Sequence, residues 1–215
     1  MAIPKKKYKD HFTYSEYKTW KEEERWEIIE GEAFDMSPAP GTSHQKVSGE
    51  IFRQLANFLD TRPCQVFAAP FDLFLPEEEE KPDEISTIVQ PDIVVICDEA
   101  NLSEKGYTGA PDIVIEILSP SSAPRDQIIK RDLYERKGVR EYWIVDPTGK
   151  IVWQYNLING AYGKPAVFDF KSSPASEVLP DLRLNLRKVF DMEDYDESAN
   201  ERRPEYSAKS KEKRL

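Results

Sequence analysis

Two carboxylates lie inside stretches of the sequence that are otherwise apolar. Asp92 lies in QPDIVVI and Glu116 lies in DIVIEIL. Burying a carboxylate among Ile and Val side chains is costly unless a cation or hydrogen bonds compensate. Two strands that each carry such a residue therefore predict a shared cation. Oxygen ligands favour a hard divalent ion, Mg²⁺ or Mn²⁺.

Lys130 lies on the helix expected directly after the Glu116 strand, and the short connection SPSSAPR brings that helix close to the carboxylates. An ammonium group there can steady a hydroxide or the charge of a phosphate in a transition state. Each residue alone also has a structural interpretation: Asp92 as a strand-end cap, Glu116 as the partner of a buried Arg or Lys, and Lys130 as an exposed helix residue. The three together favour a catalytic metal site.

Three other side chains are candidates with looser roles. His44 begins a long helix after a Pro/Gly loop, where it would contact the scissile phosphate or a metal-bound water, or serve only as a residue of the first helical turn. Glu27 and Glu30 precede the turn at Gly31 and point to opposite faces of a strand. One of them can add an acid to the site, and an exposed hairpin face is the simpler account of Glu30.

The elements that must position these residues follow from hydrophobic periodicity and turn residues. The expected helices cover 14–24, the stretch from an N-cap at Thr42 or Ser43 to about Leu59, and 126–137. The expected strands cover 26–30, 32–36, 66–75, 89–97, 112–118, 141–146, 151–155, 162–170 and 182–186. Residues 98–111 are expected to form a long loop. The order helix, strand, strand, strand, helix, strand in the core predicts an α/β sheet.

Length and composition favour a single domain. The 215 residues divide into a flexible N-terminus (1–11), a domain (12–190) and a polar, disordered tail (191–215). The formal net charge of −10 counts against nonspecific coating of DNA, which depends on Lys and Arg displacing counterions.

Cys64 and Cys97 have no metal-binding spacing, so we expect two reduced thiols. No apolar run approaches the ~18 residues of a membrane span, and we expect a cytoplasmic protein with no membrane association. The sequence contains no phosphate-binding glycine loop, no nucleophile elbow and no HExxH motif.

Five short segments of the sequence occur in a characteristic order. They are RWEIIEGEAFDMSPAPGTSHQ, APFDLFLP, VQPDIVVI, GAPDIVIEILSPSS and RDQIIKRDLYERKGVREYWIVDP. In this order and spacing, from about Phe12 to Phe190, the chain resembles the Uma-two family of bacterial restriction-endonuclease-like proteins. That family is placed in the PD-(D/E)xK nuclease superfamily.

The resemblance implies a restriction-endonuclease-like mixed sheet core (αβββαβ), with an extra N-terminal helix and hairpin and extra C-terminal strands. It also implies a metal held by Asp92, by Glu116 and by the backbone carbonyl of Ile117. The usual ExK lysine would stand at position 118, which is Leu118 here, whereas Lys130 matches the lysine that this family carries on the following helix. Glu27 and His44 also match recurring positions of the family.

The expected function is that of a Mg²⁺- or Mn²⁺-dependent endonuclease acting on DNA. The ion would lower the pKa of its water, Lys130 would orient or deprotonate that water, and in-line attack would leave a 5′-phosphate end. Two alternatives stay open: a non-catalytic interaction module that keeps the nuclease fold, and a metal hydrolase of another phosphodiester. A homodimer, formed through the sheet edge and the aromatic residues after Pro147, is a further expectation.

Overall fold

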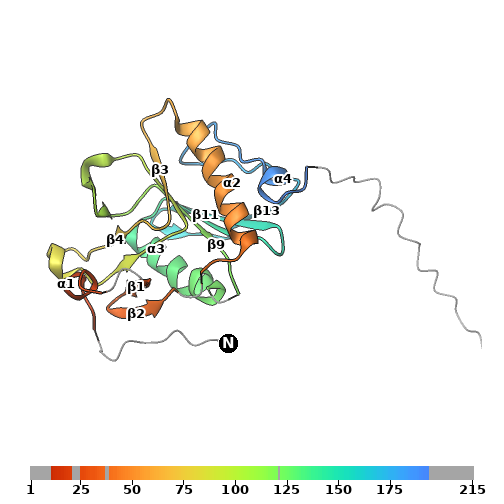
Figure 1. The fold of residues 1–215 in the computed structure, drawn as a ribbon. Coiled ribbons are helices and arrows are strands. Elements are labelled where there is room, and N and C mark those ends of the chain that lie inside the picture. The colour runs from red at the N-terminus through yellow and green to blue at the C-terminus, as the bar shows by residue number, and fades with distance from the viewer. Residues whose placement is uncertain (1–10, 21–24, 37–38, 121, 194–215) are drawn as a thin grey trace, which may run out of the picture.

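The computed structural model describes residues 11–20, 25–36, 39–120 and 122–193 (Figure 1). Most of the expected flexible N-terminus (1–10) and of the expected polar tail (194–215) lies outside the described residues. Within them, strands of the central sheet lie between helices, and the order of the core elements is the one expected from the sequence (Figure 1).

The central sheet is mixed and contains the strands that carry the candidate residues. Its order is β12-β11-β10-β9-β6-β3, with β13 paired to β11. Only β9 and β10 run parallel, as expected for two strands joined by a helix. The strands are β3 (Gln65–Ala68), β6 (Ile93–Ile96), β9 (Ile113–Ile117), β10 (Glu141–Asp146), β11 (Ile151–Ile158), β12 (Ala161–Tyr162) and β13 (Ala166–Asp169).

A second sheet lies beside the first and has the order β2-β1-β5-β4-β8-β7. It consists of β1 (Trp26–Ile29), β2 (Glu32–Asp35), β4 (Leu73–Phe74), β5 (Ile88–Val89), β7 (Leu102–Ser103) and β8 (Gly106–Thr108). The sequence predicted one strand over 66–75 and one over 89–97, but each is divided between the two sheets. The breaks fall at Pro70 and Pro91, because proline has no N–H to donate to a ladder. The expected loop 98–111 contains the β7–β8 hairpin.

The helices differ from expectation mainly at their ends. They are α1 (Tyr14–Tyr17), α2 (Thr42–Leu59), the 3₁₀ turns η1 (Pro82–Glu84) and η2 (Glu99–Asn101), the π-helical η3 (Arg125–Lys130), α3 (Arg131–Lys137) and α4 (Leu186–Val189). The first helix was expected to reach position 24 and ends at Tyr17. The expected strand over 182–186 is an isolated bridge between Ala175 and Arg183, followed by α4.

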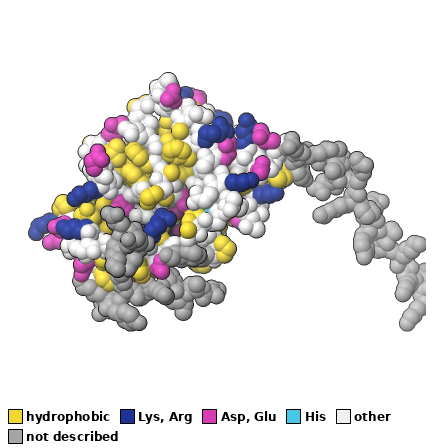
Figure 2. All heavy atoms as spheres, in the orientation of Figure 1, with side chains coloured by type: hydrophobic (Ala, Val, Ile, Leu, Met, Phe, Trp, Pro, Cys, Tyr) yellow, Lys and Arg dark blue, Asp and Glu magenta, His cyan; other side chains and the backbone are white. Residues whose placement is uncertain are grey.

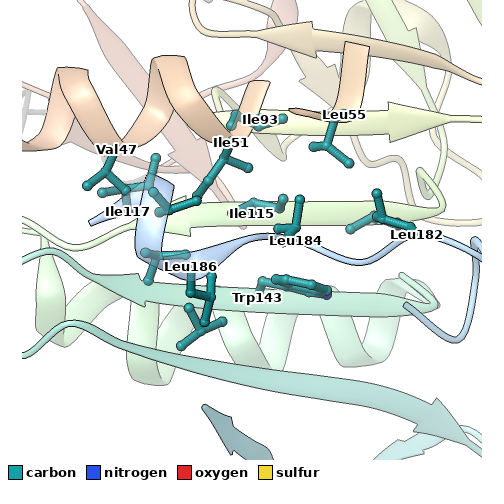
Figure 3. Packing of buried hydrophobic residues seen from close by; sticks show 14 of the residues in the cluster. Val47, Ile51, Leu55, Ile93, Ile115, Ile117, Trp143, Leu182, Leu184 and Leu186 are labelled. Atoms are coloured by element: carbon teal, nitrogen blue, oxygen red, sulfur yellow. The ribbon is translucent and has the colours of Figure 1, made fainter. Parts of the chain in front are cut away.

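Helix α2 packs its apolar stripe on one face of the central sheet, as the helical spacing predicted (Figure 3). Val47, Ile51 and Leu55 are buried against Ile93 and Ile115. The residue before the helix is Gly41, so neither Thr42 nor Ser43 is the N-cap that was expected.

The opposite face of the sheet is covered by η3 and α3, whose Leu133 and Tyr134 join the cluster of Val94 and Val114. Tyr134, Tyr142 and Trp143 are buried core residues. Because Glu116 shares a strand face with Val114, its side chain points toward η3 and α3.

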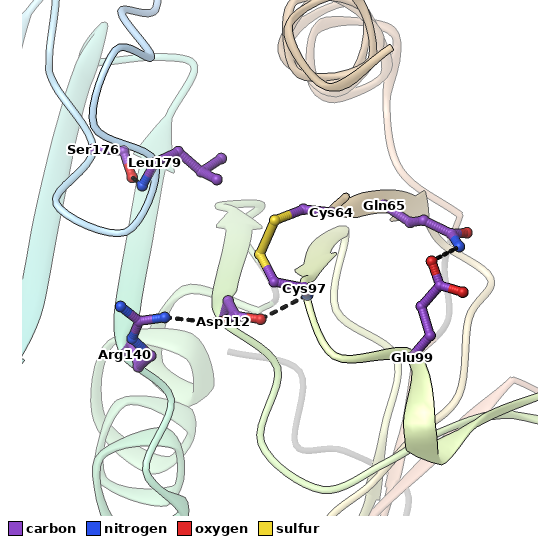
Figure 4. The surroundings of a disulfide bond; sticks show 8 residues. All are labelled: Cys64, Gln65, Cys97, Glu99, Asp112, Arg140, Ser176 and Leu179. Atoms are coloured by element: carbon purple, nitrogen blue, oxygen red, sulfur yellow. Dashed lines mark hydrogen bonds and ion pairs between the residues drawn. A yellow bond between two sulfur atoms is a disulfide. The ribbon is translucent and has the colours of Figure 1, made fainter. Parts of the chain in front are cut away.

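Cys64 and Cys97 form a disulfide bond, so the expectation of two reduced thiols is wrong (Figure 4). The two cysteines occupy the next ladder position after the paired strands β3 and β6, and their side chains therefore meet. They are 33 residues apart, and cysteine spacing alone does not reveal that the two strands pair. Asp112, beside the disulfide, accepts hydrogen bonds from the Cys97 N–H (2.7 Å) and from Arg140 (2.8 Å).

No helix among the described residues is both long and apolar enough to span a membrane. On the face shown in Figure 2, Lys and Arg side chains lie next to Asp and Glu, and no continuous basic stripe crosses the described surface in that view. This arrangement agrees with the acidic net charge.

Candidate active site

Asp92 lies at the break between β5 and β6, where its carboxylate replaces a missing strand partner. The pairing of β6 with β9 begins at Ile93, opposite Ile115. The Ile117 N–H, further along β9, donates to Asp92 Oδ2 at 2.8 Å. In a strand the N–H and C=O of one residue point to the same side, so the Ile117 carbonyl also faces Asp92.

Glu116, in the middle of β9, is almost completely buried. Its Oε1 accepts hydrogen bonds from Lys130 Nζ (2.8 Å) and from the Tyr134 hydroxyl (2.9 Å). Burial raises the pKa of Glu116 to about 8; Lys130 opposes the rise, and the neighbouring carboxylates add to it. Glu116 is thus a carboxyl group that holds a proton near neutral pH when no further cation is present.

Lys130 is 1% exposed, so its interpretation as an exposed helix lysine is wrong. Its Nζ donates to Glu27 Oε1 at 2.6 Å and to Glu116 Oε1 at 2.8 Å, and it lies 3.8 Å from Asp126 Oδ1. Burial lowers the pKa of Lys130, but the three carboxylates outweigh that effect and raise the pKa above its ordinary value. The ammonium group therefore stays charged.

The π-helical segment η3 explains how Lys130 reaches this position. It turns Asp126 and Lys130 inward and leaves Ile128 (60% exposed) and Ile129 (41% exposed) on the surface. Single π turns inside α-helices are frequent at functional sites. Burying the charged pair while exposing two isoleucines costs stability, and such violations of the usual pattern are expected where a site is built.

Glu27 and Asp126 complete the group of carboxylates around Lys130. Glu27 is fully buried; its Oε1 also accepts the Gln90 N–H at 3.0 Å, and its Oε2 lies 3.5 Å from Arg125 Nε without a hydrogen bond. Asp126 Oδ1 likewise has no hydrogen-bond partner, and burial raises the Asp126 pKa. The sequence analysis did not select Asp126. The signal available was its spacing of four residues from Lys130, which would place both on one helical face.

His44 lies against Asp92 at the start of α2. Its Nε2 is 3.1 Å from Asp92 Oδ2, and its buried Nδ1 has no partner. Burial lowers the pKa of His44, whereas the bond and charge of Asp92 raise it, and the net change is upward. Glu30, in contrast, lies outside the site: it is exposed and pairs with Arg136 at 2.6 Å.

One cavity of about 760 Å³ unites most of these residues. Its lining includes His44, Asp92, Glu116, Ile117 and Lys130. Glu27 reaches the cavity residues through its bond to Lys130. We call Asp92, Glu116, Glu27 and Asp126 the acid cluster.

A divalent cation at this site would be held partly by carboxylates of the acid cluster and partly by a backbone carbonyl. No three or more His, Cys, Asp or Glu side chains of the described residues are arranged to bind an ion by themselves. Two carboxylates are enough for Mg²⁺, which keeps several waters when bound. Asp92 Oδ1 and Glu116 Oε2 accept no hydrogen bond from the described residues, and the Ile117 carbonyl faces the same space. With all four carboxylates ionised, as metal binding requires, Lys130, Arg25 and Arg125 leave a formal charge of −1 when His44 is neutral.

Comparison with known proteins places this geometry in a family. The family model Uma2, described as "Putative restriction endonuclease", matches residues 14–187. A crystal structure described as "a putative nuclease belonging to DUF820", from Anabaena variabilis ATCC 29413, is similar with a TM-score of 0.68 and 22% identity. The similarity covers 84% of this chain and 98% of that one. It confirms the nuclease-like fold. None of the curated proteins matches the chain.

Proposed function

The chain belongs to the Uma2 family, and we propose that it is a divalent-metal-dependent endonuclease that hydrolyses phosphodiester bonds in DNA. The observation that carries the proposal is the cavity in which Asp92, Glu116 and Lys130 meet. The sequence had placed these groups on separate elements, and the nuclease hypothesis required them to share one pocket. The description of the family, and that of the similar solved structure, point to the same class of reaction.

In this proposal Asp92, Glu116 and the Ile117 carbonyl hold Mg²⁺ or Mn²⁺. When bound, the ion supplies positive charge for the phosphate and makes a water molecule more acidic. Asp92 is oriented for this role by the Ile117 N–H and by His44, which fix one oxygen and leave the other free. Orientation of this kind is typical of groups that hold a metal in place.

Lys130 acts through its charge and not as a base. Its raised pKa keeps it protonated, so of the two roles expected from the sequence, orienting water is favoured over deprotonating it. Two of its three donors are used by Glu27 and Glu116. The positive charge of the ammonium beside the cavity stabilises the negative charge that develops during hydrolysis.

The test is nicking of supercoiled plasmid DNA with Mg²⁺ or Mn²⁺. Lys130→Met should reduce the rate by roughly 10²–10³-fold, and Asp92→Asn and Glu116→Gln should abolish cutting. Lys137→Met serves as the matched control, because that lysine bonds Glu77 outside the cavity. Equal residual cutting by the wild type and all variants would identify a contaminant and refute the proposal.

One alternative has an observation in its favour. The pair between Glu116 and Lys130 is also what a non-catalytic nuclease fold would keep for structural reasons. The thermal stability of the protein separates the two. A metal present at 100 times its Kd should stabilise the folded state by about 2.7 kcal/mol, so Mn²⁺ should raise the Tm of the wild type and not that of Asp92→Asn. A non-catalytic module would show no rise. If Mn²⁺ binds but DNA is not cut, nucleotides and RNA are the substrates to test.

Two expectations belong with this proposal. A DNA substrate fits a cytoplasmic protein, and cutting both strands of a duplex fits a homodimer that brings two sites together. Light scattering of the purified protein, alone and with DNA, measures the second directly.

A further inference from the structure

Two arginines line the cavity with donors that nothing in the described chain accepts. The Arg125 side chain is 13% exposed; its Nε has no hydrogen-bond partner, and Glu27 Oε2 is 3.5 Å away. Arg25 bonds Gln90 Oε1 through Nη2 at 3.1 Å, yet its buried Nε has no acceptor. Unpaired buried donors are costly, so these two groups require an explanation.

The surroundings of Arg25 hold it in position. The side-chain amide of Gln90 donates from Nε2 to Asp72 Oδ1 (2.8 Å) and to the Tyr17 hydroxyl (3.2 Å). That arrangement turns the amide oxygen toward Arg25, and the Gln90 backbone N–H is fixed by Glu27. Asp72 is itself partly buried and also accepts from Tyr17 (3.0 Å). Arg25 is therefore held by a preformed network that uses one of its nitrogens and spares Nε.

The charges around the cavity indicate which kind of ligand would accept hydrogen bonds from these two arginines. The acid cluster repels any anion, and Lys130 is already bonded to two carboxylates. An anionic substrate needs cationic groups that are not consumed in this way. A guanidinium offers several donors in a planar fork that matches phosphate oxygens.

We propose that Arg25 and Arg125 form a phosphate clamp, which holds a phosphate group of the nucleic-acid backbone over the acid cluster. This inference rests on the proposed function for the identity of the ligand and adds two residues that touch it. The same chemistry fits an internal phosphodiester or a terminal 5′-phosphate.

The test measures binding in EDTA, so that it does not depend on the metal. A short fluorescein-labelled single-stranded oligonucleotide is titrated by anisotropy, once with a 5′-hydroxyl and once with a 5′-phosphate, at several salt concentrations. Arg25→Gln and Arg125→Gln should each weaken binding about tenfold. Each should also reduce the slope of log K against log salt by about 0.7, the value for one phosphate contact on a single strand.

Two further variants keep the experiment decisive. Arg125→Lys keeps the charge beside Glu27 and loses the fork, so it should bind with intermediate affinity and an unchanged salt slope. Arg136→Gln, an exposed arginine on α3 that pairs with Glu30, should bind like the wild type. Weaker binding of either oligonucleotide by Arg25→Gln and Arg125→Gln supports the clamp. Whether the 5′-hydroxyl or only the 5′-phosphate oligonucleotide is affected shows which phosphate is bound.

Equal binding by the wild type and both Gln variants overturns the clamp, as does failure of the folded wild type to bind either oligonucleotide. The Tm shift with Mn²⁺ is measured on the same samples. If oligonucleotide binding does not depend on the arginines but Mn²⁺ still raises the Tm, only the clamp is refuted and the proposed metal-dependent function is unaffected. Conversely, a missing shift with arginine-dependent binding refutes the metal site and leaves the clamp.

Discussion

Two glutamates of the central sheet are equally inaccessible to solvent but are compensated in opposite ways. Glu141, at the start of β10, and Glu116, in the neighbouring β9, are exposed by 0% and 3%. Glu116 is paired with the ammonium of Lys130 and the hydroxyl of Tyr134. Glu141 has no cationic partner among the described residues and instead accepts five hydrogen bonds from neutral groups.

The donors to Glu141 use both of its oxygens. Trp143 and Gln154 donate to Oε1, and the Ser176 hydroxyl (2.8 Å) with the N–H groups of Glu177 (3.0 Å) and Val178 (3.1 Å) donate to Oε2. The carboxylate thereby fastens the C-terminal segment to the sheet. A buried group that is satisfied by neutral donors on both oxygens has no capacity left for a ligand.

The acid cluster retains that capacity. Glu27 Oε2 and Asp126 Oδ1 are buried without a hydrogen bond, and His44 Nδ1 lacks a partner as well. Native proteins satisfy the large majority of their buried polar groups, so a concentration of exceptions around one cavity indicates a place for a ligand. Burial of a carboxylate does not by itself distinguish structure from function, whereas the completeness of its hydrogen bonding does.

The contrast between the two glutamates predicts its largest loss of stability for Lys130→Met. The change leaves Glu27, Glu116 and Asp126 without their shared cation, and breaking a buried ion pair in this way typically costs about 3–5 kcal/mol. Chemical denaturation at neutral pH measures the loss in free energy of unfolding. Lys137→Met, at the end of the following α3, loses a pair with the exposed Glu77 and a hydrogen bond to the Pro76 carbonyl, and should cost about 1–2 kcal/mol. Comparable losses in the two variants would show that the acid cluster needs no cation.

A gradual effect is expected from pH, because the pKa of Glu116 is raised from 4.5 to about 8 in the folded state. A carboxyl group with a raised folded pKa contributes stability that is fully present below pH 4.5 and is lost as the pH rises through 8. In metal-free protein this loss amounts to at most about 1.4 kcal/mol per pH unit. Denaturation curves between these pH values measure it.

The matched variants for that experiment are Glu116→Gln and Glu141→Gln. The first removes the titrating group with the raised pKa and should flatten the dependence of stability on pH. The second should lower stability by about 2 kcal/mol at neutral pH, since it disrupts the hydrogen bonds that hold Glu141. A slope that survives in Glu116→Gln would assign the titration to another group.

The sequence predicted the scaffold of the site better than its charge balance. Asp92 and Glu116 were recognisable because Asp92 directly precedes, and Glu116 interrupts, a run of β-branched residues, and the runs became β6 and β9. The helix that covers 42–59 could also be predicted, from its stripe of apolar residues at helical spacing. The sequence did not predict that two of the expected strands would each be divided between two sheets. A proline shows where a ladder ends but not where the chain goes next.

The residues that contact the buried acids were harder to predict from the sequence, for a different physical reason. Asp126 looked like an ordinary helix residue, because an α-helical pattern would have buried Ile128 and Ile129 and exposed the charges. The π-helical turn reverses that pattern. The role of Glu141 could not be predicted either, since four of its five donors come from residues 13–37 positions away. Which of two buried carboxylates is satisfied depends on tertiary contacts, and periodicity does not encode these.

The finest test removes one hydroxyl donor from each glutamate. Tyr134→Phe deletes one hydrogen bond to a buried carboxylate and should cost about 1 kcal/mol. Ser176→Ala deletes the bond to Glu141 and also the acceptor of the Leu179 N–H (2.9 Å), so it should cost about 2 kcal/mol. Their effects on metal should differ. Tyr134 orients Glu116, and loss of a group that orients a metal ligand lowers affinity by about tenfold or more. Calorimetric titration with Mn²⁺ should therefore detect weaker binding in Tyr134→Phe and wild-type binding in Ser176→Ala. If the two variants bind Mn²⁺ equally, Glu116 is as purely structural as Glu141, and the distinction between the two carboxylates fails at the level of function.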